Sequence, residues 1–68
     1  MLDIDWNKVP EGYDWAAQDK CGIVYAYRER PFIVEKHGIW AADGRCEHVE
    51  VLKKNRSWKN SLTHRSEK

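Results

Sequence analysis

The stretch IVYAYR, residues 23–28, has the alternating pattern of a β-strand. Ile23, Tyr25 and Tyr27 fall on one side of an extended chain, and the residues between them fall on the other. No window between residues 20 and 52 has the 3.6-residue apolar period of a helix. The region therefore predicts a mainly β fold, a small antiparallel meander of three to four strands. Three similar runs follow: FIVEK (32–36), IWAA (39–42) and EHVEVL (47–52).

Turn residues separate these runs. KHG, residues 36–38, predicts a tight turn, and ADGR, residues 42–45, is a strong hairpin signal between the last two runs. Pro31 cannot donate to a strand ladder, so it is expected at the start or edge of a strand. In the last run, the spacing of Val49 and Val51 predicts that both face the same side of the sheet.

The segment before residue 20 is less regular. Pro10-Glu11-Gly12 predicts a turn, and YDWAAQ, residues 13–18, fits either a first strand or one helical turn. We expect the strand, because Asp19 and Gly22 flank a plausible hairpin leading into Ile23.

The C-terminal segment predicts a short helical turn, which would make the fold α+β. Ser57 resembles an N-cap, and the i,i+4 spacing of Trp58 and Leu62 places both on one helix face. The last five or six residues are expected to be frayed.

Sixty-eight residues make one domain near the lower limit for an unaided core, so the four tryptophans supply much of it. Charge divides this domain into three segments. Residues 1–19 hold five acids and one lysine, an acidic aromatic lid over the predicted β core at 20–52. Residues 53–68 hold six bases and one acid. Trp6 and Trp15 are expected to cover the sheet as core residues, or to leave one ring exposed as an anchor for a partner.

The segment IDWNKVPEG, residues 4–12, resembles the N-terminal signature of small accessory proteins of tailed bacteriophages. Those proteins continue with short strands rich in Trp and Tyr and often end in a Trp-x-x-Ser segment, and WKNS stands here at residues 58–61. After Gly12, where that family commonly has a small residue and a histidine, this chain has Tyr13, Asp14 and Trp15. The resemblance implies a phage origin and a compact β-sheet, and it carries no catalytic motif.

A metal site would have to use Cys21, His37, Cys46 and His48. Their spacing matches neither of the usual zinc-ligand pairs, so we expect no metal and no cofactor. A Cys21–Cys46 disulfide between neighbouring strands is the alternative to free thiols. Free, buried or half-buried cysteines are the simpler expectation for a cytoplasmic protein.

Enzymatic activity is not expected. The sequence has no phosphate-binding glycine loop, nucleophile elbow or metalloprotease motif, and a thin sheet does not readily form a deep pocket. No catalytic residue is therefore assigned. The mean hydropathy is −0.86. No apolar run approaches the roughly 20 residues of a membrane span. With no secretory leader in this sequence, we expect a protein of the host cytoplasm with no membrane partner.

Two classes of function fit these features. The first is a phage-encoded protein-binding module, an inhibitor or modulator of a host enzyme such as a defence or transcription component. A small sheet offers it an exposed edge and a face of aromatic and arginine side chains, and two such edges also make a homodimer possible. The alternative for each tyrosine is that its ring belongs to the core and does not contact a partner. The candidate contacts with a host or phage protein are Tyr25, Tyr27, Arg28, Arg30 and Trp40.

The second class is nucleic-acid binding through the basic C-terminal segment. Bases interleaved with an aromatic residue suit a phosphate backbone and a stacked base. The acidic front opposes this function, and a basic segment that is solvated or pairs with the acidic segment is a simpler explanation. The candidate residues are Lys53, Lys54, Arg56, Trp58 and Lys59.

Overall fold

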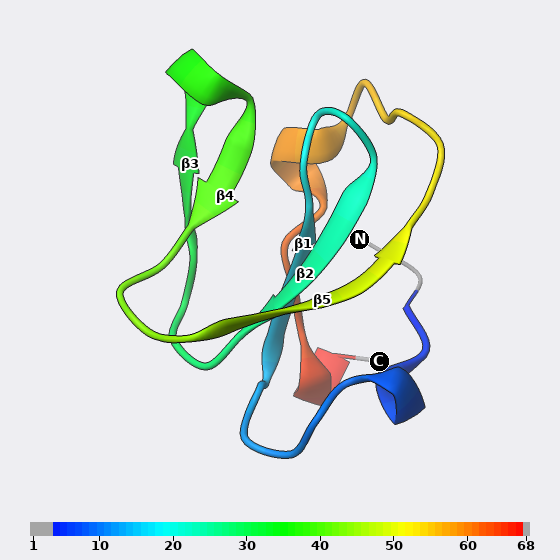
Figure 1. Ribbon diagram of the computed structural model, residues 1–68, viewed down its shortest axis with the longest axis vertical. Coiled ribbons are helices and arrows are strands. Elements are labelled where there is room, and N and C mark those ends of the chain that lie inside the picture. The colour runs from blue at the N-terminus through cyan, green and yellow to red at the C-terminus, as the bar shows by residue number, and fades with distance from the viewer. Residues whose placement is uncertain (1–3, 68) are drawn as a thin grey trace.

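The computed structural model, which describes residues 4–67, contains two antiparallel sheets (Figure 1). A four-stranded sheet has the order β5-β2-β1-β6, and β3 and β4 form a separate pair. The mainly β expectation is confirmed. The strands are β1 (Trp15–Gln18), β2 (Ile23–Tyr27), β3 (Phe32–Val34), β4 (Ile39–Ala41), β5 (Cys46–Val51) and β6 (Thr63–His64).

The helical elements of residues 4–67 are single 3-10 turns, and none is long and apolar enough to cross a membrane. The C-terminal turn predicted after Ser57 is present as η3, although the Ser57 side chain makes no capping hydrogen bond. The turns are η1 (Trp6–Lys8), η2 (Glu35–His37), η3 (Trp58–Asn60) and η4 (Arg65–Glu67).

The β1–β2 hairpin is the centre of the larger sheet. The strand expected within residues 13–18 is confirmed as β1, and Ala16 pairs with Ala26 opposite it. The connecting turn is closed by the Gly22 amide, which donates to the Asp19 carbonyl at 2.9 Å. Gly22 has φ +104°, and a Cβ there would lie 2.2 Å from the carbonyl oxygen of Leu52. Only glycine therefore lets the chain after β5 approach this turn so closely.

The third and fourth predicted runs do not form the expected hairpin. The turn at 36–38 is confirmed, with Gly38 in the left-handed conformation after η2. At 42–45, however, the chain leads from β4 into a strand that pairs with β2 instead. β5 pairs along all five residues of β2, whereas β4 has only three and already pairs with β3. The longer ladder satisfies more backbone groups, so the local turn signal does not decide the pairing.

A bulge changes the facing of β5. The register shifts between Val24 and Tyr25, which pair with Glu50 and His48, so Val49 is left as an extra residue. Bulged strands place two residues opposite one, which breaks the strict alternation. Val49 consequently packs against the buried cluster of Trp6, whereas Val51 is 63% exposed. The prediction that both valines face the same side is wrong for this reason.

Both faces of the four-stranded sheet are covered. On the side that carries Ala16 and Ala26, here the lid face, the N-terminal segment packs Trp6, Val9 and Tyr13. The opposite side, here the hairpin face, is covered by the β3–β4 hairpin and η3 (Figure 1). The sheet draws on all three charge segments, because β1 belongs to the first and β6 to the last.

The two tryptophans of the N-terminal segment lie on opposite sides of the sheet. Trp6 is 5% exposed on the lid face, and Trp15 is half-buried against the hairpin-face cluster. Both rings therefore contribute to the buried clusters. This confirms the expectation that they are core residues and not exposed anchors for a partner.

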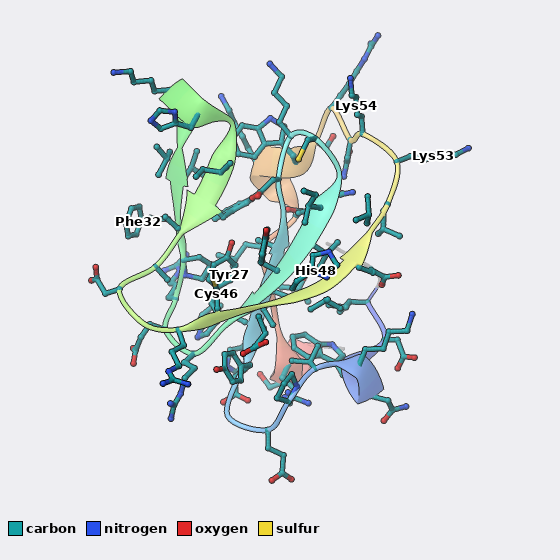
Figure 2. All side chains as sticks on the ribbon, in the orientation of Figure 1. Tyr27, Phe32, Cys46, His48, Lys53 and Lys54 are labelled. Atoms are coloured by element: carbon teal, nitrogen blue, oxygen red, sulfur yellow. The ribbon has the colours of Figure 1, made fainter. Side chains whose placement is uncertain are left out.

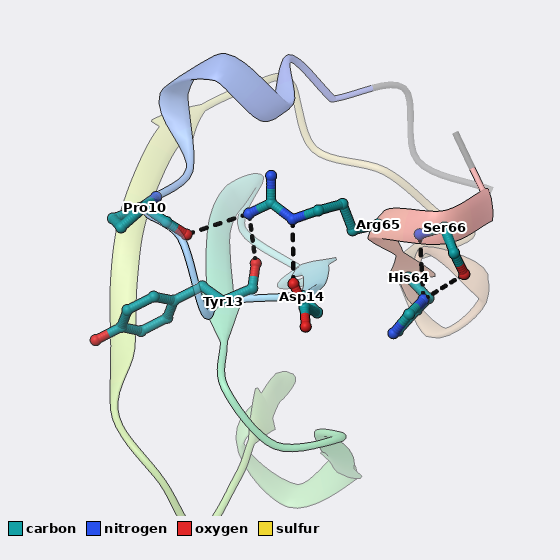
Figure 3. A network of polar contacts seen from close by, with 6 residues as sticks. All are labelled: Pro10, Tyr13, Asp14, His64, Arg65 and Ser66. Atoms are coloured by element: carbon teal, nitrogen blue, oxygen red, sulfur yellow. Dashed lines mark hydrogen bonds and ion pairs between the residues drawn. The ribbon is translucent and has the colours of Figure 1, made fainter.

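Arg65 fastens the C-terminal segment to the acidic front (Figure 3). Its Nε lies 3.2 Å from Oδ1 of Asp14, and one terminal nitrogen donates to the carbonyls of Pro10 and Tyr13 at 3.1 and 3.0 Å. The guanidinium carbon lies 4.8 Å from the centre of the Trp6 ring. Together with β6, these contacts order residues 63–66, so the expectation of a frayed end is wrong there; residue 68 lies outside the described residues.

Replacing Gly22 with alanine is expected to destabilise the protein by on the order of 2 kcal/mol or more, because the new Cβ meets backbone and φ is positive. Urea unfolding measures this loss. Gly44→Ala is the matched control, since its Cβ would contact only flexible side chains of the neighbouring loop. Equal stability of the two variants would contradict the close approach at Gly22.

Candidate functional site

Two of the five predicted protein contacts are core residues. Tyr27 is 2% exposed and Trp40 is 7% exposed. The Tyr27 hydroxyl donates to the Trp40 carbonyl at 3.2 Å. Figure 2 shows Tyr27 inside the molecule, where the β3–β4 hairpin covers its face of the sheet. The prediction that the Tyr27 side chain is reachable is therefore wrong, because it treated this face as open.

Trp40 attaches the hairpin to the rest of the protein. Its amide donates to Oδ1 of Asp19 at 2.9 Å, and its indole Nε1 lies 3.1 Å from the carbonyls of both Gln18 and Trp58. Each partner lies on a different segment: the end of β1, the turn after it, and η3. The ring thus fixes the position of the hairpin relative to both the sheet and the C-terminal segment.

The Gln18 side chain orders the start of the basic segment. Its Nε2 donates to the carbonyls of Gly22 and Lys53, at 3.2 and 3.0 Å, and its Oε1 accepts from Nδ2 of Asn55 at 3.0 Å. Its backbone amide donates to Oγ of Ser61 at 2.8 Å. Residues 53–61 are therefore held against β1 by buried polar contacts.

The remaining predicted protein contacts are accessible to different degrees. Tyr25 is half-buried, with its ring edge-on to His48 at 5.8 Å. Arg28 and Arg30 are exposed, and their guanidinium groups lie 5.9 and 5.7 Å from the rings of Tyr13 and Trp15. These cation–π contacts support the arginine stems while the charged groups stay in water.

A groove lies between the β3–β4 hairpin and residues 59–62. Its volume is about 540 Å³. Phe32 and Ile33 are 52% and 37% exposed beside it. Figure 2 shows the Phe32 ring at the outer side of β3. Leaving two large apolar side chains in water is unfavourable for a chain with so small a core. The lining residues are Arg30, Pro31, Phe32, Ile33, Trp40, Lys59, Asn60 and Leu62.

An exposed ion pair joins the two sides near this groove. Nζ of Lys59 contacts Oε1 of Glu35, which connects η3 to the hairpin turn. The hydrogen bond from Lys59 and its positive charge hold the pKa of the Glu35 carboxyl below its usual value. Lys59 is thus already paired with a carboxylate, and Arg30 is the unpaired base of the groove among the described residues.

The structure only partly assembles the residues predicted for nucleic acid. Trp58 is 6% exposed in the hairpin-face core, so its ring is not free to stack on a base. Lys59 contacts Glu35. Lys53, Lys54 and Arg56 are exposed, as predicted for contacts to phosphate.

Lys20 and His37, which the sequence did not connect with the basic segment, lie beside it. Lys20, from the β1–β2 turn, lines one hollow with Lys54 and Arg56, and it lines a second hollow with Lys54 and His37. No periodicity or motif in the sequence connects Lys20 to the basic segment. Lys20 comes near this segment because Gln18, two residues before it, is bonded to Lys53 and Asn55 across the fold.

Both cysteines are free and exposed. The expectation of buried or half-buried thiols is wrong, because Cys21 lies in a turn and Cys46 begins the outer strand β5 (Figure 2). Within residues 4–67, no three side chains of His, Cys, Asp or Glu are grouped so that they could hold a metal ion.

The chain matches no family model, no curated protein and no solved structure.

The buried carboxylate of Asp19 gives the fold a pH dependence. Asp19 is 4% exposed, and burial raises the pKa of its carboxyl above the usual 3.8, against the lowering effect of the hydrogen bond from the Trp40 amide. A folded pKa above the unfolded value means that the native state binds the proton more tightly. The cost of burying the charge is absent below about pH 3.8 and is complete above the raised pKa.

Asp19→Asn should therefore gain stability relative to the natural protein as the pH rises from about 4 toward neutrality, because the amide oxygen can still accept from Trp40 without a charge. Urea unfolding of both proteins across this range measures the difference. Asp43→Asn, at an exposed loop position, corrects for the change in net charge. A difference that is constant with pH would contradict the assignment.

Proposed function

We propose that this chain is a small, non-enzymatic protein-binding module that holds an extended segment of another protein in the groove beside β3. The observation that carries the proposal is the exposure of Phe32 and Ile33 next to a concave, partly apolar surface. Large rings beside a pocket are typical of the centres of protein interfaces.

The chemistry of the groove defines the segment that would fit it. Ile33, Trp40 and Leu62 provide an apolar surface for one aliphatic or aromatic side chain. Within the described residues, β3 pairs only with β4, so its other edge can add an extended strand. Arg30 at the groove favours an acidic residue beside the apolar one. The occupant is therefore an extended, apolar and acidic segment of a partner protein.

The biological setting of this proposal comes from the resemblance of residues 4–12 to accessory proteins of tailed bacteriophages. We propose that the protein acts in the host cytoplasm and that its partner is a host enzyme, such as a defence or transcription component. Binding of one of its extended segments would inhibit or modulate that enzyme.

Substitutions in the groove test this proposal. Phe32→Ser and Arg30→Glu should each weaken binding of a partner captured from bacterial lysate by about tenfold or more, because interface energy is concentrated in few residues. Val51→Ser and Arg45→Glu are the matched controls, an exposed apolar residue and an exposed arginine outside the groove. Titration of the purified partner measures all four affinities, and the activity of the partner enzyme measures inhibition.

Two further measurements identify the occupant. A peptide array of the partner should contain one extended apolar and acidic segment that competes with the intact partner. Sedimentation of the protein alone tests a second copy as the occupant: a dimer that Phe32→Ser abolishes would contradict the proposal, as would equal effects of Phe32→Ser and Val51→Ser. Deleting residues 57–68 would not test the groove, because the deletion removes Trp58 and β6 from the fold.

A further inference from the structure

The basic side chains of the C-terminal segment fall into two groups. Lys59 and Arg65 are paired with Glu35 and Asp14. Lys54 and Arg56 form no ion pair with any residue in the described part of the chain, and the same holds for Lys20 from the β1–β2 turn. Lys53 forms none either, but only Lys20, Lys54 and Arg56 lie around a common hollow.

These three bases line one hollow. Lys20, Lys54 and Arg56 surround it together with Asn55 and Trp58, and its volume is about 460 Å³. A second hollow of about 270 Å³ shares Lys20 and Lys54. It adds the imidazole of His37 and the thiol of Cys21. No acidic residue of the described part of the chain lines either hollow, so no lining carboxylate offsets the three positive charges.

The backbone that carries the bases is fixed. The Lys20 amide donates to the Gly38 carbonyl at 2.9 Å, and a Cβ at Gly38 would lie 3.2 Å from Cβ of Lys20. The aliphatic part of Lys20 thus packs against Gly38, where a larger residue would collide with it. The left-handed φ of +66° at Gly38 also favours glycine there. On the other side, Asn55 is bonded to Gln18 and accepts the Ser57 amide. Like charges that line one hollow repel one another, and a bound anion would relieve the repulsion.

We propose that Lys20, Lys54 and Arg56 form a binding site for phosphoryl groups. The planar guanidinium of Arg56 suits bidentate contact with phosphate oxygens, and the two ammonium groups supply point charges and donors. Asn55 and Trp58 complete the lining beside them. The size of the hollow suits a ligand as large as a nucleotide.

Two sources share this chemistry, a free nucleoside polyphosphate and the phosphate backbone of single-stranded nucleic acid. The site differs from the surface predicted from the sequence alone. It includes Lys20, excludes Lys59, and does not depend on a base stacking on the buried Trp58. It shares no lining residue with the groove beside β3, so it stands or fails separately from the protein-binding function.

Binding is tested with inorganic pyrophosphate, ATP and a labelled 12-nucleotide oligothymidylate, at matched low ionic strength with chloride as the reference. Calorimetry, fluorescence anisotropy and the shift in Tm give the affinities. Lys20→Ala, Lys54→Ala and Arg56→Ala should each weaken binding by about tenfold or more, because each removes a charge-assisted contact. All three side chains are exposed, so Tm without ligand should be unchanged.

Lys53→Ala is the matched control. Lys53 is exposed and adjacent to Lys54, and its substitution changes the net charge equally, but its side chain lines neither hollow (Figure 2). It should weaken binding by less than about threefold, which is what loss of a screened, distant charge produces. Phe32→Ser should leave binding unchanged.

The outcomes separate the sources. Saturable binding of pyrophosphate or ATP with the expected variant pattern identifies a free phosphorylated ligand. Binding of the oligonucleotide alone, with the same pattern and a steep salt dependence, identifies a nucleic-acid backbone. Either supports the site. Absence of binding to all three probes would overturn it, and so would equal effects of Lys53→Ala and Lys54→Ala, which would indicate a diffuse charge effect.

Discussion

The attachment of Trp40 to β1 and η3 is the interaction on which the rest of this structure depends. The four-stranded sheet is too small to bury its hairpin face alone, and the β3–β4 pair would be marginal in isolation. Burial of the Trp40 ring and its hydrogen bonds to Asp19, Gln18 and Trp58 join the two sheets. A net value of about 1 kcal/mol for each such bond is small, but leaving these buried groups unpaired would cost more.

Charge is arranged so that each segment of the chain is fastened by a specific pair. Arg65 connects the C-terminal end to the acidic front, and Lys59 connects η3 to the hairpin at Glu35. Lys8 lies 3.6 Å from Glu50 and connects the N-terminal turn to β5. Exposed pairs of this kind contribute little energy each, and their effect is to orient segments already held by buried contacts. Lys20, Lys54 and Arg56 are among the described bases that form no ion pair, and they differ from the others because they line one hollow together, which is why they support a ligand site.

The groove lies where the hairpin meets the rest of the molecule, and the proposed phosphoryl site lies beside this junction, since the hollow that shares Lys20 and Lys54 with it also contains His37 and Gly38. Attachment through Trp40 creates the groove between β3 and residues 59–62, and it also brings His37 and Gly38 beside Lys20. Neither surface exists on a single hairpin or on the basic segment alone. A short chain thus gains two separate surfaces from one junction, at the cost of leaving Phe32 and Ile33 in water.

The sequence by itself determined the strands between residues 15 and 51, the turn at 36–38 and the exposure of Arg28, Arg30, Lys53 and Lys54, because alternation, glycine and charge act locally. It did not predict β6, which forms by pairing with the distant β1. Tertiary structure decided which strands pair and which faces are covered. The ADGR segment does not form the predicted hairpin, because β5 pairs with the longer strand β2. Tyr27 and Trp40 are core residues, because segments distant in the sequence cover their face of the sheet. Lys20 joined the basic segment through Gln18, a contact across 35 positions. Such long-range contacts depend on the packing of the whole chain, and no local sequence pattern predicts them.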